Sequence, residues 1–587
     1  MGEFIKMKLS FDDVLRHLGE FGRYQKWMSL FLSLSGITFG IRMMISVFLL
    51  NIPGHRCAIP GYDNDTYDVQ SDNHAHVINA TIPYVVKDGK LQLDSCHIYF
   101  DVANSTNDRA NRTVVACKKW VYDKSVFEST VSSELNFVCD NAILATHSKV
   151  IFMAGCFLGS FAAGTLGDKI GRKKALYLCL LLLITGGVIL NWSSNFVMFV
   201  ILRFFNGASA VGVFVSCFVI GIEMVGSSKR VRFGALLETF FAIGMVVLSG
   251  LAYFIRDWHT LELATAIPVA ACLVYWWIIP ESPRWLLKQR RQEEAEVIIR
   301  RMADVNRVKL PDNLFEEHET ETGTHDDDTP KGSFFDLFTT PVMCIRTLII
   351  FLNWFVVSMV YYGLSLHSDN LGAGSLHLNF LLVGLVEFPA FVFVILLLNK
   401  LGRKVMYCAS VLVGGVSCIL TIFTILYADQ TLQWVTVLLA MVGKLGSTGG
   451  FLIIYIFSSE LFPTVIRHSA TGASSSCARA GAMVAPYVVD MGKFVGGDFG
   501  RVLPLLMFGS LAVLVGLLAL FLPETLDRDL PETIEDGVQF GRQPLRLRSA
   551  GEVSGENQRG LQLLLSDSRK TDGNLPMCKK YTLPVNA

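Results

Sequence analysis

Long apolar stretches recur along most of the chain and are separated by shorter polar segments. A helix needs about 20 mostly apolar residues to cross the hydrocarbon core of a bilayer. The pattern predicts the number of such helices more precisely than the residues at which each helix begins and ends. It predicts an all-α polytopic membrane protein with twelve transmembrane helices in two six-helix halves, near residues 28–50, 145–166, 175–194, 196–221, 233–254, 262–280, 343–364, 378–398, 405–427, 433–457, 468–489 and 502–522.

The composition agrees with this fold class. The 587 residues are 52% hydrophobic and only 17% charged, whereas soluble domains carry about 25% charged residues. The 51 basic and 51 acidic residues cancel, so no net charge attracts the chain to nucleic acid. The same figures exclude intrinsic disorder for most of the chain.

The polar segments divide the chain into five parts. The first apolar stretch is longer than the hydrophobic region of a secretory signal peptide, so we expect it to remain as the first transmembrane helix. The predicted parts are a cytoplasmic N-terminus (1–27), an N-terminal six-helix half (28–280), a cytoplasmic central loop (281–342), a C-terminal six-helix half (343–522) and a polar, flexible cytoplasmic tail (523–587).

Basic residues are concentrated in alternate loops. Three loops, after the second, fourth and eighth spans, carry clusters of lysine and arginine, whereas the short loops 191–195, 365–377 and 428–432 carry none. Cytoplasmic loops of membrane proteins are enriched in Lys and Arg. We therefore expect a multi-pass protein of the cell membrane with both termini in the cytoplasm.

The first large loop, residues 51–144, is then extracellular, and its sequence has the features of an exported segment. An even number of cysteines in an oxidising compartment predicts disulfides, here two, with the pairing left open among three possibilities. The candidate cysteines are Cys57, Cys96, Cys117 and Cys139. N-x-S/T glycosylation sequons occur at Asn64, Asn79, Asn104 and Asn111.

Three short charged motifs occur in the first half and recur in the same order in the second. An ordered repetition of this kind indicates a structural repeat of six spans. The pairs are GDKIGRKK (167–174) with NKLGRK (399–404), a glutamate seven residues before an arginine (223–230 with 460–467), and PESPRWL (280–286) with PETL (523–526).

This repeat resembles the major facilitator superfamily, whose signature loop between the second and third helices matches residues 164–173. The resemblance implies that acidic and basic side chains pair at the cytoplasmic helix ends and separate as the halves move, which makes them gates. Charge that merely sets the orientation is the alternative for the loop taken alone. The gating candidates are Asp168, Arg172, Glu223, Arg230, Glu281, Arg284, Arg403, Glu460, Arg467 and Glu524; Asn399 replaces the aspartate in the second copy.

Further motifs narrow the resemblance. The cysteine-bearing first loop, ESPRWL (281–286), VEFPA (386–390) and SSELFPTVIR (458–467) are similar to the organic cation, organic anion and zwitterion (carnitine) transporter family. Sugar porters share some motifs but carry QQxSG in the seventh span, where this chain reads FLNWFVVSMVYYG (351–363). We therefore expect an organic ion rather than a sugar as substrate.

Ionisable residues inside membrane spans are costly, which makes them candidates for binding substrate. Arg479 lies mid-span among small residues, and the resemblance implies arginine at this place in anion and carnitine transporters. Its guanidinium offers a fork for a carboxylate; the alternative is an internal ion pair with Glu387 or Glu238. Glu387 precedes a proline that loosens its helix, and it either meets a substrate ammonium or pairs with an arginine.

Three other buried charges and four aromatic residues complete the candidate set. For Glu238, two roles remain open: proton transfer or an ion pair between helices. Arg42 would add positive charge to the cavity. Lys444 either faces the cavity or pairs with a carboxylate. Arg203 is expected to hold the fourth span against a neighbour. Aromatic faces attract organic cations, although packing is an equally good explanation for any one ring. The rings are Trp354, Tyr361, Tyr362 and Tyr455.

These features predict a transporter of organic cations or of carnitine-like and amino-acid-like zwitterions, working by alternating access. Organic anion exchange is the alternative, and a non-transporting receptor is a remote one. No hydrolase, metalloprotease or P-loop motif occurs, so we expect neither an enzyme nor a metal site. The expected partners are a small organic ion and the lipid bilayer; we expect no cofactor, and sodium and proton coupling both remain open.

Overall fold

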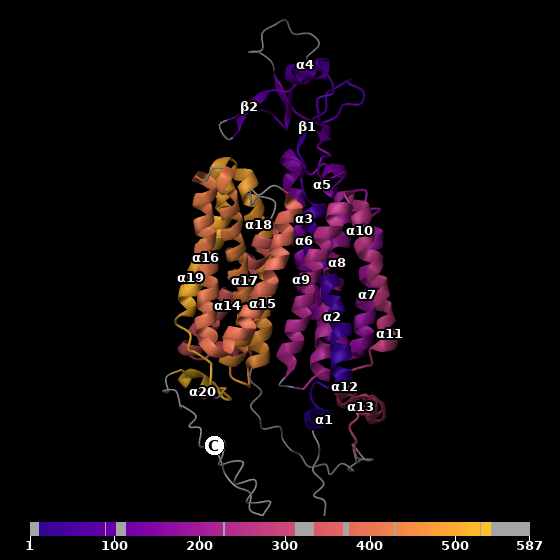
Figure 1. The fold of residues 1–587 in the computed structure, drawn as a ribbon, viewed down its shortest axis with the longest axis vertical. Helices are drawn as coiled ribbons and strands as arrows, with labels where there is room; N and C mark the ends of the chain where they lie inside the picture. Colours follow the sequence, from indigo (N-terminus) through magenta and orange to yellow (C-terminus); the bar gives the residue numbers. More distant parts are fainter. Residues whose placement is uncertain are drawn as a thin grey trace, which may run out of the picture.

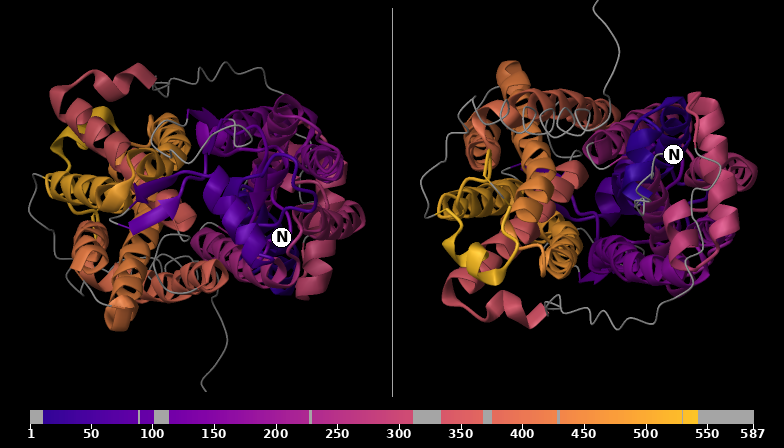
Figure 2. Two further views of the ribbon diagram at one scale, coloured as in Figure 1. Left: turned by 90° about the horizontal axis from the view of Figure 1, so that it is seen from above. Right: turned by 90° about the horizontal axis from the view of Figure 1, so that it is seen from below.

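The computed structural model describes residues 11–541, except 88–89, 101–112, 227–228, 311–333, 368–374, 428–429 and 529. Two groups of long, roughly parallel helices lie side by side (Figure 1), and both groups are also seen end-on in Figure 2. The first group, here the N-half, comprises α2 (Arg23–Met44), α3 (Ser46–Leu49), α6 (Ile143–Ile170), α7 (Arg172–Leu190), α8 (Phe196–Met224), α9 (Arg230–Phe254), α10 (Trp258–Ala266), η4 (Ile267–Val274) and α11 (Tyr275–Ile278).

The second group, here the C-half, has six long helices. They are α14 (Pro341–Leu366), α15 (Leu376–Leu401), α16 (Arg403–Tyr427), α17 (Gln433–Leu461), α18 (Arg467–Val495) and α19 (Gly497–Ala519). Within the described residues, eleven helical segments of the molecule are long and apolar enough to cross a membrane. The remaining long helix, α18, is rich in serine, glycine and alanine and packs against α14, α19 and α6. The predicted all-α, twelve-helix fold class is confirmed.

The helix ends differ from the predicted ones in a regular way. The α2 helix begins at Arg23 rather than residue 28, and α18 runs from Arg467 to Val495 rather than over 468–489. Polar residues at a helix end can reach the membrane interface while remaining helical, so hydropathy alone ends such helices too early. The sixth span also departs from a single helix, because 3₁₀ structure (Ile267–Val274) separates α10 from α11.

The insertion after α3, residues 51–142, projects from one end of the N-half (Figure 1). We call it the loop domain and its end of the bundle the loop-domain end; the opposite end is the terminal end. The loop domain contains α4 (Asp72–Thr81), α5 (Val131–Glu134) and three antiparallel strand pairs. The pairs are β1 (His55–Cys57) with β6 (Trp120–Tyr122), β2 (Tyr84–Lys87) with β3 (Lys90–Leu93), and β4 (His97–Tyr99) with β5 (Val114–Ala116).

Two disulfides cross the loop domain. They join Cys57 to Cys117 and Cys96 to Cys139, which confirms the predicted number and selects one of the three pairings. Of the four sequons, Asn64 and Asn79 are exposed, whereas Asn104 and Asn111 lie outside the described residues. Glycosylation of these sites stays a prediction.

A buried polar triad organises the loop domain beside the first disulfide. The carboxylate of Asp65 accepts hydrogen bonds from Arg56, from the amide of Ile59 (2.8 Å) and from Nε2 of His74 (3.0 Å). Burial alone would raise the pKa of Asp65, but these hydrogen bonds and the nearby guanidinium outweigh it and hold that pKa below its usual range. The triad therefore relies on an ionised Asp65.

Short helices cover the terminal end. They are α1 (Phe11–His17), α12 (Pro283–Lys288), α13 (Gln292–Asn306), η5 (Phe334–Phe338) and α20 (Ile534–Gln539). The side chain of Asn306 accepts from the Tyr24 amide (2.9 Å) and donates to the Leu18 carbonyl (3.1 Å), which fixes α13 against the start of α2. The tail is more ordered near its start than we expected, because Arg346 donates to the Gly537 and Phe540 carbonyls and holds α20.

Candidate functional site

A cavity with a volume of about 110 Å³ lies between the two halves and has room for several water molecules. Helices of both halves contribute to its wall. The N-half lines it with Phe39, Met43, Met153, Cys156, Val211, Phe214, Val215, Glu238 and Phe241. The C-half contributes Ser358, Tyr361, Tyr362, Phe451, Tyr455, Ser475, Ala478, Arg479 and Ala482.

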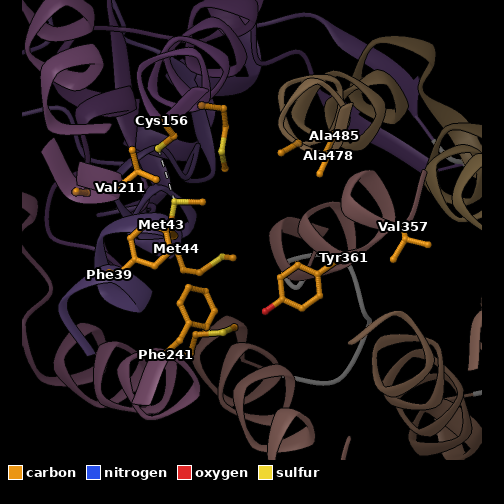
Figure 3. Packing of buried hydrophobic residues seen from close by; sticks show 14 of the residues in the cluster. Phe39, Met43, Met44, Cys156, Val211, Phe241, Val357, Tyr361, Ala478 and Ala485 are labelled. Atoms are coloured by element: carbon orange, nitrogen blue, oxygen red, sulfur yellow. Dashed lines mark hydrogen bonds between the residues drawn. The ribbon is translucent and has the colours of Figure 1, made fainter. Parts of the chain in front are cut away.

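Apart from Glu238, the wall is apolar on the N-half side, and it is richer in hydroxyl groups on the C-half side. Figure 3 shows Phe39, Met43 and Phe241 of the N-half across an opening from Tyr361, whose hydroxyl group is directed toward them. A mostly apolar pocket with a few placed polar groups is the usual form of a small-molecule site. Among the described residues that line it, two are charged, Glu238 and Arg479.

Arg479 is held along its own helix. Its Nη1 atom donates to the side-chain oxygen (2.5 Å) and the carbonyl oxygen (3.2 Å) of Ser475, one turn earlier in α18. Ala478 and Ala482 beside it are small, so the helix surface leaves room for a ligand at the guanidinium. Among the described residues, Arg479 is hydrogen-bonded to Ser475 and is not paired with Glu387 or Glu238, and it lines the cavity.

Glu387 and Lys444 pair with each other. The Nζ atom of Lys444 lies 2.8 Å from Oε1 of Glu387, and both side chains are 1% exposed. The ammonium group also donates to the Ser365 hydroxyl (2.8 Å) and lies 3.4 Å from the centre of the Tyr361 ring. Neither residue lines the cavity described above. We therefore assign them to an ion pair without net charge, which packs against the Tyr361 ring outside the cavity.

Three of the four predicted aromatic residues line the cavity, namely Tyr361, Tyr362 and Tyr455. Trp354 is fully buried and packs edge-on against Tyr455, with ring centres 4.3 Å apart. We therefore assign Trp354 to positioning Tyr455. Phe451, which the sequence did not bring to attention, stacks on Tyr361 at 5.1 Å. Phe451 lies four residues before Tyr455 on the same helix, so the two rings share one helix face. This spacing could have identified Phe451 from the sequence.

Arg42 lies inside the N-half rather than on the cavity wall. It forms a buried ion pair with Glu262 of α10, so its charge is neutralised there. Arg203 donates to the Ser46 hydroxyl and lies over the Phe152 ring, with 4.4 Å between its guanidinium carbon and the ring centre. This agrees with the expected structural role of Arg203.

The motif charges at the terminal end form matching clusters in the two halves. In the N-half, Arg172 pairs with Asp168 (2.8 Å) and Glu223 (3.2 Å). Glu281 accepts from the backbone amides of Arg172 (2.8 Å) and Lys173 (3.1 Å). The carboxylate of Glu281 thereby caps the start of α7.

The C-half repeats this arrangement. Arg403 pairs with Glu460 (3.0 Å), and Glu524 accepts from the amides of Arg403 (2.8 Å) and Lys404 (3.0 Å). The other three gating candidates make different contacts. Arg230 donates to the Ile222 carbonyl (3.3 Å), Arg467 donates to the Phe462 carbonyl (3.1 Å), and Arg284 lies over the Phe11 ring.

Among the described residues, the hydrogen bonds between the halves lie at the loop-domain end. Asp490 of α18 accepts from Lys149 (2.9 Å) and Thr146 (2.8 Å) of α6. On the other side of the bundle, Ser249 of α9 donates to the His377 carbonyl (2.8 Å), and the His377 ring reaches the Ala252 carbonyl (3.2 Å). The sequence motifs did not identify these residues, because they belong to none of the repeated motifs.

Comparison with known proteins agrees with this arrangement. Residues 90–536 match the family described as "Sugar (and other) transporter". An organic cation transporter protein of Drosophila melanogaster is 38% identical over 559 residues, covering 94% of this chain and 99% of the relative. The chain belongs to the organic cation transporter family of the major facilitator superfamily. The human organic cation/carnitine transporter 2 is 35% identical, with 89% of this chain and 93% of the relative covered.

Solved structures show the same fold. The xylose transporter XylE of E. coli, in a partially occluded inward-open conformation, matches with a TM-score of 0.56 over 86% of this chain and 100% of that one, at 16% identity. At this identity the likeness concerns the fold alone. Membership in the organic cation transporter family makes the chain a membrane transporter of small organic solutes and not an enzyme.

Proposed function

We propose that this organic cation transporter family member carries small organic ions across the plasma membrane by alternating access, with zwitterions of the carnitine or amino-acid type as its favoured substrates. One observation carries the proposal: Arg479 and Glu238 line a single cavity from opposite halves, together with three tyrosines. A guanidinium suits a substrate carboxylate. A carboxylate beside aromatic faces suits an ammonium group.

The balance of charge around the cavity favours a zwitterion over an anion. Arg42 and Lys444, the other basic candidates, are each paired with a glutamate. The cavity wall is therefore left with one positive and one negative residue. The relatives include an organic cation transporter and an organic cation/carnitine transporter, and organic cations and carnitine are the natural first probes.

The contacts between the halves support the alternating-access part of the proposal. Lys149 and Asp490 join the halves at the loop-domain end, whereas the charged motifs of the terminal end pair within their own half. With both termini in the cytoplasm, this arrangement corresponds to an inward-facing state. A substrate that bridges Glu238 and Arg479 would draw the two halves together around it.

Uptake into cells tests the proposed site. We expect Arg479→Ala to abolish saturable uptake of labelled carnitine and β-alanine but to retain part of the uptake of a quaternary amine, because only the zwitterions present a carboxylate. Glu238→Gln should reduce uptake of all three. Arg291→Ala removes an exposed arginine outside the cavity and is the matched control. Unchanged uptake of every substrate by Arg479→Ala would refute the site.

Organic anion exchange remains a second candidate, because the Arg479 guanidinium would also bind an anion. Competition separates the two. If dicarboxylates inhibit uptake and quaternary amines do not, the anion function is supported. The same uptake measured with sodium replaced, and across a proton gradient, identifies the coupling ion.

A further inference from the structure

A second group of charged side chains lies within the N-half, behind the wall of the cavity. Its members are Arg42 of α2, Arg203 and Asn206 of α8, and Glu262 of α10; each is no more than 2% exposed. The two arginines and one glutamate leave a formal net charge of one positive unit inside the membrane-spanning region. A buried charge without a counter-ion is strongly unfavourable in such surroundings.

The four residues form one cluster. Arg42 forms its ion pair with Glu262, and Arg203 donates to Ser46, which lies one helical turn after Arg42. Asn206 follows Arg203 by three residues, on the same face of α8. Arg42 and Glu262 both act electrostatically on Arg203.

Several polar atoms of this cluster have no hydrogen-bond partner among the described residues. The unpartnered donors are Nε and Nη2 of Arg42, Nε of Arg203 and Nδ2 of Asn206; the unpartnered acceptors are Oε2 of Glu262 and Oδ1 of Asn206. Buried donors in folded proteins nearly always have a partner. The cluster thus has more unpartnered donors than acceptors and an excess of positive charge. A bound ligand that is negatively charged and accepts hydrogen bonds would balance both.

The neighbouring helix α7 packs closely against the cluster through two glycines. Gly186 and Gly187 of α7 face it: a Cβ atom on Gly187 would lie 3.2 Å from Nη2 of Arg42, and one on Gly186 would lie 3.1 Å from Oδ1 of Asn206. A side chain at either position would crowd Arg42 or Asn206. The two glycines therefore keep the side chains of α7 out of the cluster, and the close packing limits a guest to the size of a single ion.

We propose that this cluster binds a small monovalent anion of the halide type, which completes the charge balance of the N-half. The site is separate from the transport cavity, because none of the four residues lines that cavity. The bound anion is structural: it holds α2, α8 and α10 together around Gly186 and Gly187.

Thermal unfolding of the purified full-length protein tests the proposal at constant ionic strength. In sodium chloride or bromide the midpoint should rise relative to sodium gluconate, since an ion that binds only the folded state stabilises it increasingly as the ion concentration exceeds its Kd. Arg203→Met and Asn206→Asp each remove the net positive charge, and both should lose this dependence on the halide. Asn206→Asp keeps the size of the side chain, so it tests the proposal even if Arg203→Met does not fold.

Arg479→Ala is the matched control, because it removes the arginine of the transport cavity and leaves the cluster intact. It should keep the full halide effect. If the effect disappears in Arg479→Ala and persists in Asn206→Asp, the anion binds in the cavity and the proposal is wrong. If halides have no effect on the wild-type protein, water satisfies the cluster and the proposal is equally refuted. Neither outcome depends on which substrate is transported.

Discussion

Five acidic–basic contacts decide which charges are available to a substrate. Two ion pairs are buried inside the halves: Arg42 with Glu262, and Lys444 with Glu387. At the helix ends, Arg172 and Arg403 each pair with a glutamate. Asp490 is occupied by Lys149. Of the ionisable residues that the sequence singled out within the spans, Arg479 and Glu238 are the two on the cavity wall.

The buried pair in the C-half gives a prediction at this scale. Lys444→Met leaves Glu387 as an uncompensated buried carboxylate, and we expect a loss of about 3–5 kcal/mol in the free energy of unfolding. The double variant Lys444→Met, Glu387→Gln removes both charges and should recover most of that loss. Denaturation of the purified protein measures both values, and equal stability of the single and double variants would contradict the pairing.

The loop-domain triad gives a prediction about pH. The pKa of Asp65 is lowered in the folded protein, so its contribution to stability is present above the pKa of the unfolded chain. It is lost as the pH falls through the lowered folded value. Asp65→Asn should reduce the protection of loop-domain amides from hydrogen exchange at neutral pH and flatten its acid dependence. Similar exchange in both proteins from neutral to acid pH would count against the triad.

Glycines set the turns between neighbouring helices. Gly171 after α6 and Gly402 after α15 have φ angles of +105° and +93°, which side chains rarely adopt. A Cβ atom at either position would also meet the carboxylate of Glu281 or Glu524 within 2.6 Å. The repeated glycine and the repeated glutamate are therefore parts of one structural element, which brings the helix ends together in each half.

This arrangement predicts a difference between two glycines in the same loop motif. Gly171→Ala should sharply reduce folded protein at the cell surface, because it combines an unfavourable φ with a clash at Glu281. Gly164→Ala, seven residues earlier, places its Cβ in open space and should be tolerated. Surface labelling of both variants measures this, and equal surface levels would refute the role of the turn.

In the part of the chain that the structure describes, hydrogen bonds join the two halves at the loop-domain end, and Lys149 with Asp490 is part of that junction. Under the alternating-access proposal, Lys149→Asp should open the loop-domain end and expose Cys156, a cavity-lining thiol, to a membrane-impermeant thiol reagent added outside the cell. The exchanged double variant Lys149→Asp, Asp490→Lys should restore protection. A Cys156→Ser background controls for other thiols; unchanged labelling of Cys156 in the single variant would argue against this junction.

Sequence patterns predicted the scaffold better than the partners of its charges. Hydropathy and the repeated motifs were sufficient for the twelve-helix fold, and an even number of cysteines predicted the two disulfides. Hydropathy predicts which segments lie in the lipid bilayer. It does not predict which neighbouring helix a buried side chain contacts. The sequence therefore left Glu387 open between a substrate ammonium and an arginine, and the structure pairs it with Lys444, fifty-seven residues later. Asp490 went unnoticed because its partner lies on the other half.

The loop domain is attached to the membrane part at α3 and α6, two helices of the same half. Any rotation of the N-half must therefore carry the loop domain with it, and points far from the bundle travel further than the helices themselves. The exposed Asn79 near its outer side is such a point. Under the alternating-access proposal, a fluorescent label on this domain would therefore report each conformational change of the N-half in a single molecule.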